Sequence, residues 1–202
     1  MQRRSLIALP PALLLSACAA PGSPPAPQII SSAEWGAAPP SANPTPHRIE
    51  HITLHHQGET WVPGKDAAAY LRRLQTWSRE TKHWADIPYH YVISPEGLTY
   101  AARPENQPGD TNTEYNPRGH ALVMLLGNFE EVEPTTAALG SCAEVMAWIA
   151  LRHHLGVETI ASHKDHSKQT VCPGAHLYRY LQNGWLKRAV AERMAGRALP
   201  AV

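Results

Sequence analysis

The sequence has few cysteines, no excess of charge of one sign, no repeat of solenoid length and no apolar run long enough to cross a bilayer. Its 18 basic and 17 acidic residues nearly cancel, which argues against a nucleic-acid partner and against a polybasic membrane patch. At 202 residues the chain is long enough for one globular domain with a substantial core, and too short for two large ones.

The most apolar stretch, residues 1–17, is typical of an export signal. It starts with the basic MQRR and continues as SLIALPPALLLSA, a run of signal-peptide length that is too short, and too interrupted by Pro10 and Pro11, to span a bilayer. The LSAC that ends at Cys18 resembles a bacterial lipobox, and this resemblance implies that Cys18 is lipidated and becomes the mature N-terminus. A plain secretory signal that contains Cys18 by chance is the alternative.

Residues 18–27 are interpreted as the lipidated cysteine and a proline-rich tether. The segment AAPGSPPAP that follows Cys18 is small and proline-rich, so it should be extended rather than folded, with a reach of about 28 Å. Because Ala19 follows the cysteine where an aspartate could stand, the pattern resembles the one sorted to the outer membrane of Gram-negative cells. We therefore expect a periplasmic protein that is attached to the membrane through its lipid.

Residues 28–202 are predicted to form a single α/β domain with a mixed central β-sheet flanked by α-helices. Alternating or continuous apolar patterns predict strands, and apolar residues at helical spacing predict helices. The helix over 134–156 begins at a proline and ends at a glycine, which is the usual asymmetry. The predicted strands are 48–56, 89–94 and 120–129, and the predicted helices are 66–84, 134–156 and 174–194.

The three cysteines are expected to have different roles. If Cys18 carries lipid, only Cys142 and Cys172 remain for a disulfide. Cys142 recurs with apolar residues at helical spacing, which predicts a small buried hydrophobe. Cys172 lies in the polar loop SHKDHSKQTVCPG and needs another explanation.

Strand alternation separates the two adjacent histidines His55 and His56. Ile52 and Leu54 share a side with His56 and mark it as the core side, so His55 should project with Thr53 toward a polar side. His163 and Cys172 are nine residues apart, a spacing that lets a loop fold back. Together with His55 they would form a His-His-Cys set that leaves a fourth position for water, the form of a catalytic zinc site.

Sequence spacing alone leaves other interpretations of these residues open. Chance pairs of histidine and cysteine are common. His163 and His166 would share a face if their segment were helical, although His166 and Lys164 are also read as solvated loop residues. Asp165 and the turn at 173–174 are interpreted as loop-shaping groups.

Five segments in order resemble the zinc-dependent N-acetylmuramoyl-L-alanine amidases of the type-2 family, which includes peptidoglycan recognition proteins and amidase-type phage lysozymes. They are IISSAEWGAAPP, ITLHHQG, DIPYHYVISPEG, LLGNFEEVEPT and SHKDHSKQTVCPG. The resemblance implies one zinc ion per chain, held by His55, His163 and Cys172, and it implies that Tyr89 is the catalytic tyrosine.

The family also places a lysine or threonine two residues before the cysteine, facing the substrate carbonyl oxygen. Here that residue is Thr170, with Lys168 as a rival because the loop is one residue longer than in some relatives. Some members have a glutamate base about where Met124 stands, which shifts the expected mechanism toward Tyr89.

The implied activity is hydrolysis, by a zinc-activated water, of the amide bond between N-acetylmuramic acid and L-alanine in peptidoglycan. The partners would be peptidoglycan or muropeptides, and the membrane through the N-terminal lipid. A non-catalytic peptidoglycan-binding lipoprotein is the alternative function, and a zinc amidase that acts on another exported substrate is a third.

Overall fold

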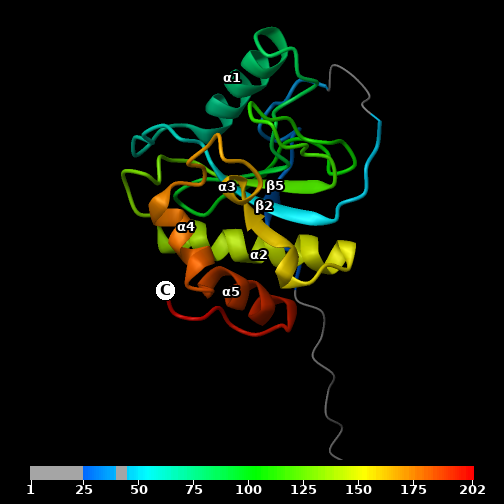
Figure 1. The fold of residues 1–202 in the computed structure, drawn as a ribbon. Helices are drawn as coiled ribbons and strands as arrows, with labels where there is room; N and C mark the ends of the chain where they lie inside the picture. The colour runs from blue at the N-terminus through cyan, green and yellow to red at the C-terminus, as the bar shows by residue number, and fades with distance from the viewer. Residues whose placement is uncertain (1–24, 40–44) are drawn as a thin grey trace, which may run out of the picture.

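Six strands form one sheet through the middle of the domain (Figure 1). The structure is a computed structural model that describes residues 25–39 and 45–202, so the predicted signal peptide (1–17), Cys18 and the tether up to residue 24 lie outside the described residues. Across the sheet the order is β1-β4-β3-β5-β2-β6; β3 and β4 pair antiparallel, whereas the other neighbours pair in parallel. The strands are β1 (Ile29–Ile30), β2 (His51–His56), β3 (Tyr91–Ile93), β4 (Thr99–Ala101), β5 (His120–Leu125) and β6 (Ile160–Ser162).

Helices cover both faces of this sheet, which confirms the predicted mixed α/β fold. Helix α1 packs on one face, and α2 and α5 lie on the other, where α5 also packs against α2 (Figure 1). Capping side chains stabilise the first turns of the two longest helices: Asp66 accepts a hydrogen bond from the Ala69 N–H, and Thr135 accepts one from the Ala138 N–H. The helices are α1 (Ala67–Glu80), α2 (Thr136–His153), α3 (His163–His166), α4 (Ala175–Gln182) and α5 (Trp185–Met194), with a 3₁₀ turn at Val157–Thr159.

Alternation along β2 sorts its side chains as predicted, but the second side is not exposed. Ile52 and Leu54 belong to the core under α2, and Thr53 and His55 take the opposite side with exposed fractions of only 0% and 2%. Alternation shows which residues share a side and not what covers it. In place of water, the Thr53 hydroxyl pairs with His120 Nδ1 at 2.8 Å.

The predicted closing helix over 174–194 is wrong, because two helices fill this segment. Between them Gly184 has φ of 74°, in the left-handed region that glycine adopts without steric penalty. Asn183 Oδ1 accepts a hydrogen bond from the Trp185 N–H at 2.9 Å, where α5 begins. The predicted helices over 66–84 and 134–156 exist with shorter bounds. Three strands, β1, β4 and β6, were not predicted, because two or three residues are too few to show alternation.

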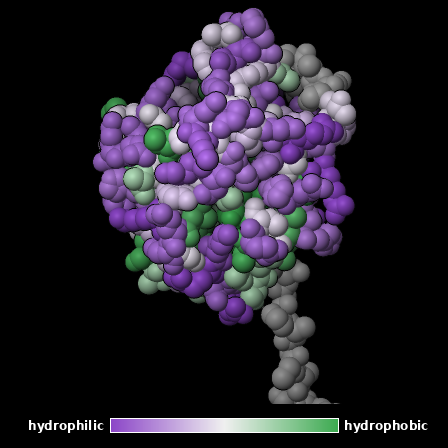
Figure 2. All heavy atoms as spheres, in the orientation of Figure 1, coloured by the Kyte–Doolittle hydropathy of each residue, from purple (hydrophilic) through white to green (hydrophobic). Residues whose placement is uncertain are grey.

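Cys142 and Cys172 are both free and buried, which confirms Cys142 as a buried residue of α2. Among the described residues no helix combines the length and the apolar character needed to cross a membrane. On the face seen in Figure 2, polar side chains cover most of the surface and apolar ones gather only in small patches.

Candidate metal and active site

The ends of two neighbouring parallel strands bring His55 and His163 together. β2 and β6 pair with Leu54 opposite Ser162, so the residues that follow these two emerge at the same edge of the sheet. The ring centroids of His55 and His163 are 4.7 Å apart. The short strand β6, which alternation could not reveal, is therefore the element that positions His163.

The loop after α3 folds back and returns Cys172 to the same point. The Lys164 N–H donates to the Cys172 carbonyl at 2.9 Å and closes the loop. Cys172 Sγ lies 3.6 Å from His55 Nδ1, and it accepts a hydrogen bond from the His56 N–H at 3.3 Å. One donor atom from each of His55, His163 and Cys172 lies within 4.8 Å of the others. The structure thus brings together the three residues that the sequence assigned to zinc.

Asp165 and Gly174 shape this loop, as predicted. The Asp165 carboxylate accepts hydrogen bonds from the Ser162 N–H and hydroxyl at 2.8 and 2.7 Å, and from the Tyr178 hydroxyl at 2.7 Å. Gly174 has φ of 88°, and a Cβ there would lie 2.4 Å from the Phe129 carbonyl carbon. A larger residue could not close the loop against Phe129 without moving one of the two backbones.

The ionisation of the three donor groups fits a metal. Burial lowers the pKa of His55 well below its usual value and lowers that of His163 to about 4, so both imidazoles are neutral and able to ligate at neutral pH. Burial raises the pKa of the Cys172 thiol to about 12, so a thiolate is stable here only beside a cation. His55 Nε2 is buried without a hydrogen-bond partner. Two neutral imidazoles and one thiolate suit zinc with an open fourth position.

The three donors lie in the wall of a cavity of about 680 Å³, which Tyr89, Thr170 and residues of α1 also line. Tyr89 lies two residues before β3, and its ring centroid is 5.2 Å from that of His55. Burial raises the pKa of Tyr89 well above its usual value, so its hydroxyl stays protonated. The cavity therefore places a hydrogen-bond donor beside the candidate metal ligands.

The rival positions Thr170 and Lys168 differ in where they point. Thr170 lines the cavity, and its Oγ1 accepts a hydrogen bond from the Cys172 N–H at 3.0 Å. Lys168 is exposed, and its backbone N–H donates to Glu114. The placement favours Thr170 as the residue that faces a substrate.

Two other interpretations can be compared with the structure. His166 is not a solvated side chain, because its ring stacks on Tyr115 at 5.6 Å and its Nε2 is buried. His163 and His166 do share the helix α3, but His166 lies outside the group of donors formed in the described part of the chain. Met124, at the position where some relatives carry a glutamate, is fully buried under α1.

Sequence reasoning missed two groups of residues at this site. Arg73 on α1 lines the cavity and has no ion pair among the described residues. Residues 110–115 lie along the loop formed by residues 163–172, called the metal loop below, and Thr113 contacts His163 directly. Both groups lie in polar positions with no informative spacing, so we find no signal in one sequence that would have identified them.

Comparison with known proteins places these features in a family. The family described as N-acetylmuramoyl-L-alanine amidase (Amidase_2) matches residues 45–175. The N-acetylmuramoyl-L-alanine amidase of Sus scrofa is 30% identical over 187 residues, which cover 85% of this chain and 30% of the relative. The chain thus spans less than a third of the length of that amidase.

Solved structures agree with this match. The crystal structure of Drosophila peptidoglycan recognition protein SD is similar, with a TM-score of 0.70 and 27% identity over 78% of this chain and 94% of that chain. Peptidoglycan recognition protein-LE in complex with tracheal cytotoxin has a TM-score of 0.68 at 25% identity, and covers 77% of this chain and 92% of that chain. Since the matched residues include both strands and the loop that carry the donors, the chain belongs to the type-2 N-acetylmuramoyl-L-alanine amidase family, which includes the peptidoglycan recognition proteins.

Proposed function

We propose that this protein is a zinc-dependent N-acetylmuramoyl-L-alanine amidase that hydrolyses the amide bond between N-acetylmuramic acid and L-alanine in peptidoglycan. The observation that carries the proposal is the convergence of donor atoms from His55, His163 and Cys172 within 4.8 Å in the wall of an open cavity. A protein that only bound peptidoglycan would need the cavity and not this donor set.

In this proposal the metal activates the water and the amide, and side chains of the protein donate hydrogen bonds to the substrate. A zinc ion held by His55, His163 and Cys172 would supply an acidified water as nucleophile and a Lewis acid for the amide carbonyl. The protonated Tyr89 hydroxyl donates a hydrogen bond to the oxygen on which negative charge develops. Because Thr170 Oγ1 accepts from the Cys172 N–H, its own proton is available to donate to the same carbonyl oxygen.

The cavity also fits a muropeptide as substrate. Its volume of about 680 Å³ is within the usual range for a site that encloses a ligand of several groups. The similar recognition protein-LE was solved with tracheal cytotoxin, described as a monomeric diaminopimelic acid-type peptidoglycan. Arg73 and Lys65 line the cavity beside Glu59 and Asp110, so its wall offers charges of both signs to a peptide.

The test is cleavage of a defined muropeptide by the purified protein, followed by mass spectrometry. We expect release of the intact stem peptide, loss of that activity with a chelator, and recovery when zinc is added back. Intact muropeptide after incubation with excess zinc contradicts the proposal. If the same protein still binds the muropeptide, that result supports the non-catalytic alternative.

We also propose that residues 1–17 are a lipoprotein signal peptide and that Cys18 carries the lipid that attaches the mature protein to a membrane, in the periplasm and at the outer membrane of a Gram-negative cell. The LSAC order and the following Ala19 support this proposal. Cells that express the wild-type chain should place it in the detergent-soluble membrane fraction, and the Cys18→Ser variant should lose both the attached lipid and this fractionation. A wild-type chain without lipid, measured by mass spectrometry, contradicts it.

A further inference from the structure

Residues 110–115, named here the support segment, contact the metal loop at several positions. Thr113 contacts His163, Glu114 contacts the residues after α3, and Tyr115 packs on the rings of His163 and His166. The segment is more than 45 residues away from the loop in sequence, so these contacts exist only in the folded domain.

The hydroxyls of Thr111 and Thr113 lie beside Nε2 of His163. Thr113 Oγ1 lies 2.8 Å from His163 Nε2, and Thr111 Oγ1 lies 3.4 Å from the same atom. The two hydroxyl oxygens are themselves 2.8 Å apart, and the Thr113 N–H donates to Thr111 Oγ1 at 3.1 Å. With Nε2 engaged in this way, Nδ1 is the ring nitrogen of His163 that is left to ligate a metal.

Glu114 holds the residues that follow α3, and Tyr115 packs against α3 itself. The Ser167 hydroxyl donates to Glu114 at 2.5 Å, and the Lys168 N–H donates to the same carboxylate at 3.2 Å. These hydrogen bonds lower the pKa of Glu114, so it remains ionised at neutral pH. The Tyr115 ring stacks on His166 and lies 5.1 Å from the His163 ring.

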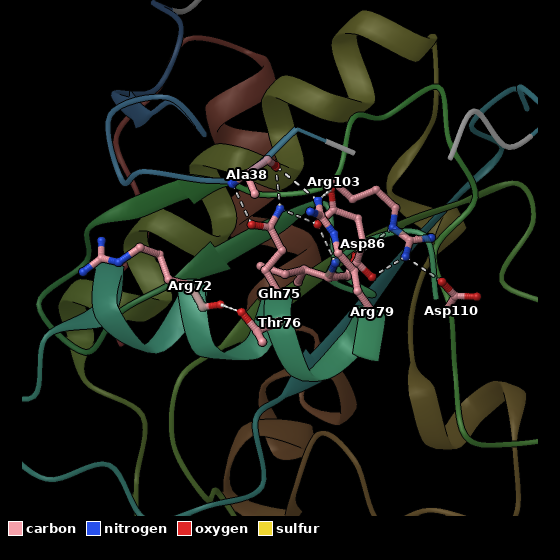
Figure 3. A network of polar contacts seen from close by, with 9 residues as sticks. Ala38, Arg72, Gln75, Thr76, Arg79, Asp86, Arg103 and Asp110 are labelled. Carbon is pink, nitrogen blue, oxygen red and sulfur yellow. Dashed lines mark hydrogen bonds and ion pairs between the residues drawn. The ribbon is translucent and has the colours of Figure 1, made fainter. Parts of the chain in front are cut away.

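The start of the support segment is fixed to the interior of the domain. Asp110 pairs with Arg103 at 2.5 Å, and Arg103 is 3% exposed. The same guanidinium donates to the carbonyls of Asp86, Ile87 and Pro108. Figure 3 shows Arg103 joined to Asp86 and Asp110. Figure 3 also shows Asp86 joined to Gln75 and Arg79 of α1. The segment is therefore held to the same backbone that leads into Tyr89.

We propose that Thr113 is a positioning residue for the metal site: its hydroxyl accepts a hydrogen bond from His163 Nε2–H when Nδ1 ligates the metal and so holds the orientation of the ring, and Glu114 holds the loop on which His163 and Cys172 lie, so that the support segment raises the affinity for zinc. Metal-bound histidines commonly donate their second nitrogen to an outer partner, and loss of such a partner typically weakens metal binding about 10- to 100-fold. The inference rests on the proposed function, because it assumes that these three residues bind zinc.

The test measures zinc affinity on the full mature protein by competition with a chromophoric chelator, with no substrate present. Thr113→Val keeps the shape and removes the hydroxyl, and we expect it to bind zinc about 10- to 100-fold more weakly. Thr113→Ser restores the hydroxyl and should recover most of the affinity. The unfolding midpoint of the metal-free proteins, measured in urea, should be similar, because Thr113 lies in a partly exposed loop.

Asn112→Ala is the matched control, because Asn112 is an exposed neighbour in the same segment and donates no hydrogen bond to the metal loop. It should bind zinc as tightly as the wild type. A folded Thr113→Val protein with wild-type affinity overturns this inference and leaves the proposed metal site standing. A wild-type protein that binds no zinc overturns both, so the two failures are distinguishable.

Discussion

Replacing Cys172 with serine should abolish zinc binding and amidase activity while leaving the fold in place. Burial alone raises the pKa of the thiol to about 12, and a neighbouring cation is what would make it a thiolate ligand. A serine alcohol in the same surroundings is a far weaker acid and would stay neutral. It could still accept the hydrogen bond that the His56 N–H donates to Sγ. We therefore expect a loss of zinc affinity larger than the roughly 100-fold that removal of an outer partner causes.

Metal content and muropeptide turnover, measured on the same preparation, check this expectation. Cys142→Ala is the control, because Cys142 is a fully buried thiol of α2 that packs beside Met146 and belongs to the core on the other face of the sheet. It should lower stability through lost packing and keep full zinc content. A Cys172→Ser protein with wild-type zinc content and turnover would show that the thiol is not a ligand.

The two histidines and the cysteine illustrate how far a sequence alone can lead. Alternation along β2 separated His55 from His56 because Ile52 and Leu54 mark the core side, and the structure keeps this separation. The nine-residue spacing of His163 and Cys172 predicted a loop that folds back, which the Lys164 to Cys172 hydrogen bond closes. What spacing could not supply was the pairing of β2 with β6, since that pairing depends on contacts between distant segments.

The surroundings of the site were beyond prediction for a physical reason. The side that Thr53 and His55 share is polar, as expected, but side chains from distant segments replace water there, as His120 does for Thr53, and alternation could not show this. Thr113 and Glu114 belong to a polar loop whose partners lie about fifty residues away, and neither alternation nor helical spacing marks such residues. The periodicity of apolar residues indicates which side of a helix or strand is buried. Polar loops that support a site bury few apolar side chains and therefore show no such pattern.

Replacing Tyr89 with phenylalanine should lower kcat about 10²- to 10³-fold with little change in KM and no change in zinc content. The ring itself fills space beside His55, at 5.2 Å between centroids, and phenylalanine retains that packing. What is lost is a hydroxyl that burial keeps protonated, because the pKa of Tyr89 is well above its usual value. Such a donor is most valuable when charge develops on the substrate oxygen, so its loss should appear in kcat.

Tyr70→Phe is the matched control, since Tyr70 also lines the cavity but stands on α1 against Trp61. It removes a hydroxyl from the same cavity and should leave kcat close to the wild-type value. Equal kcat for the Tyr89→Phe and wild-type proteins would mean that Tyr89 only packs against His55. Thr170 would then be the side chain that stabilises the negative charge on the substrate oxygen. A fall in zinc content with Tyr89→Phe would instead show that the hydroxyl supports the metal site, because phenylalanine keeps the ring and lacks only the hydroxyl.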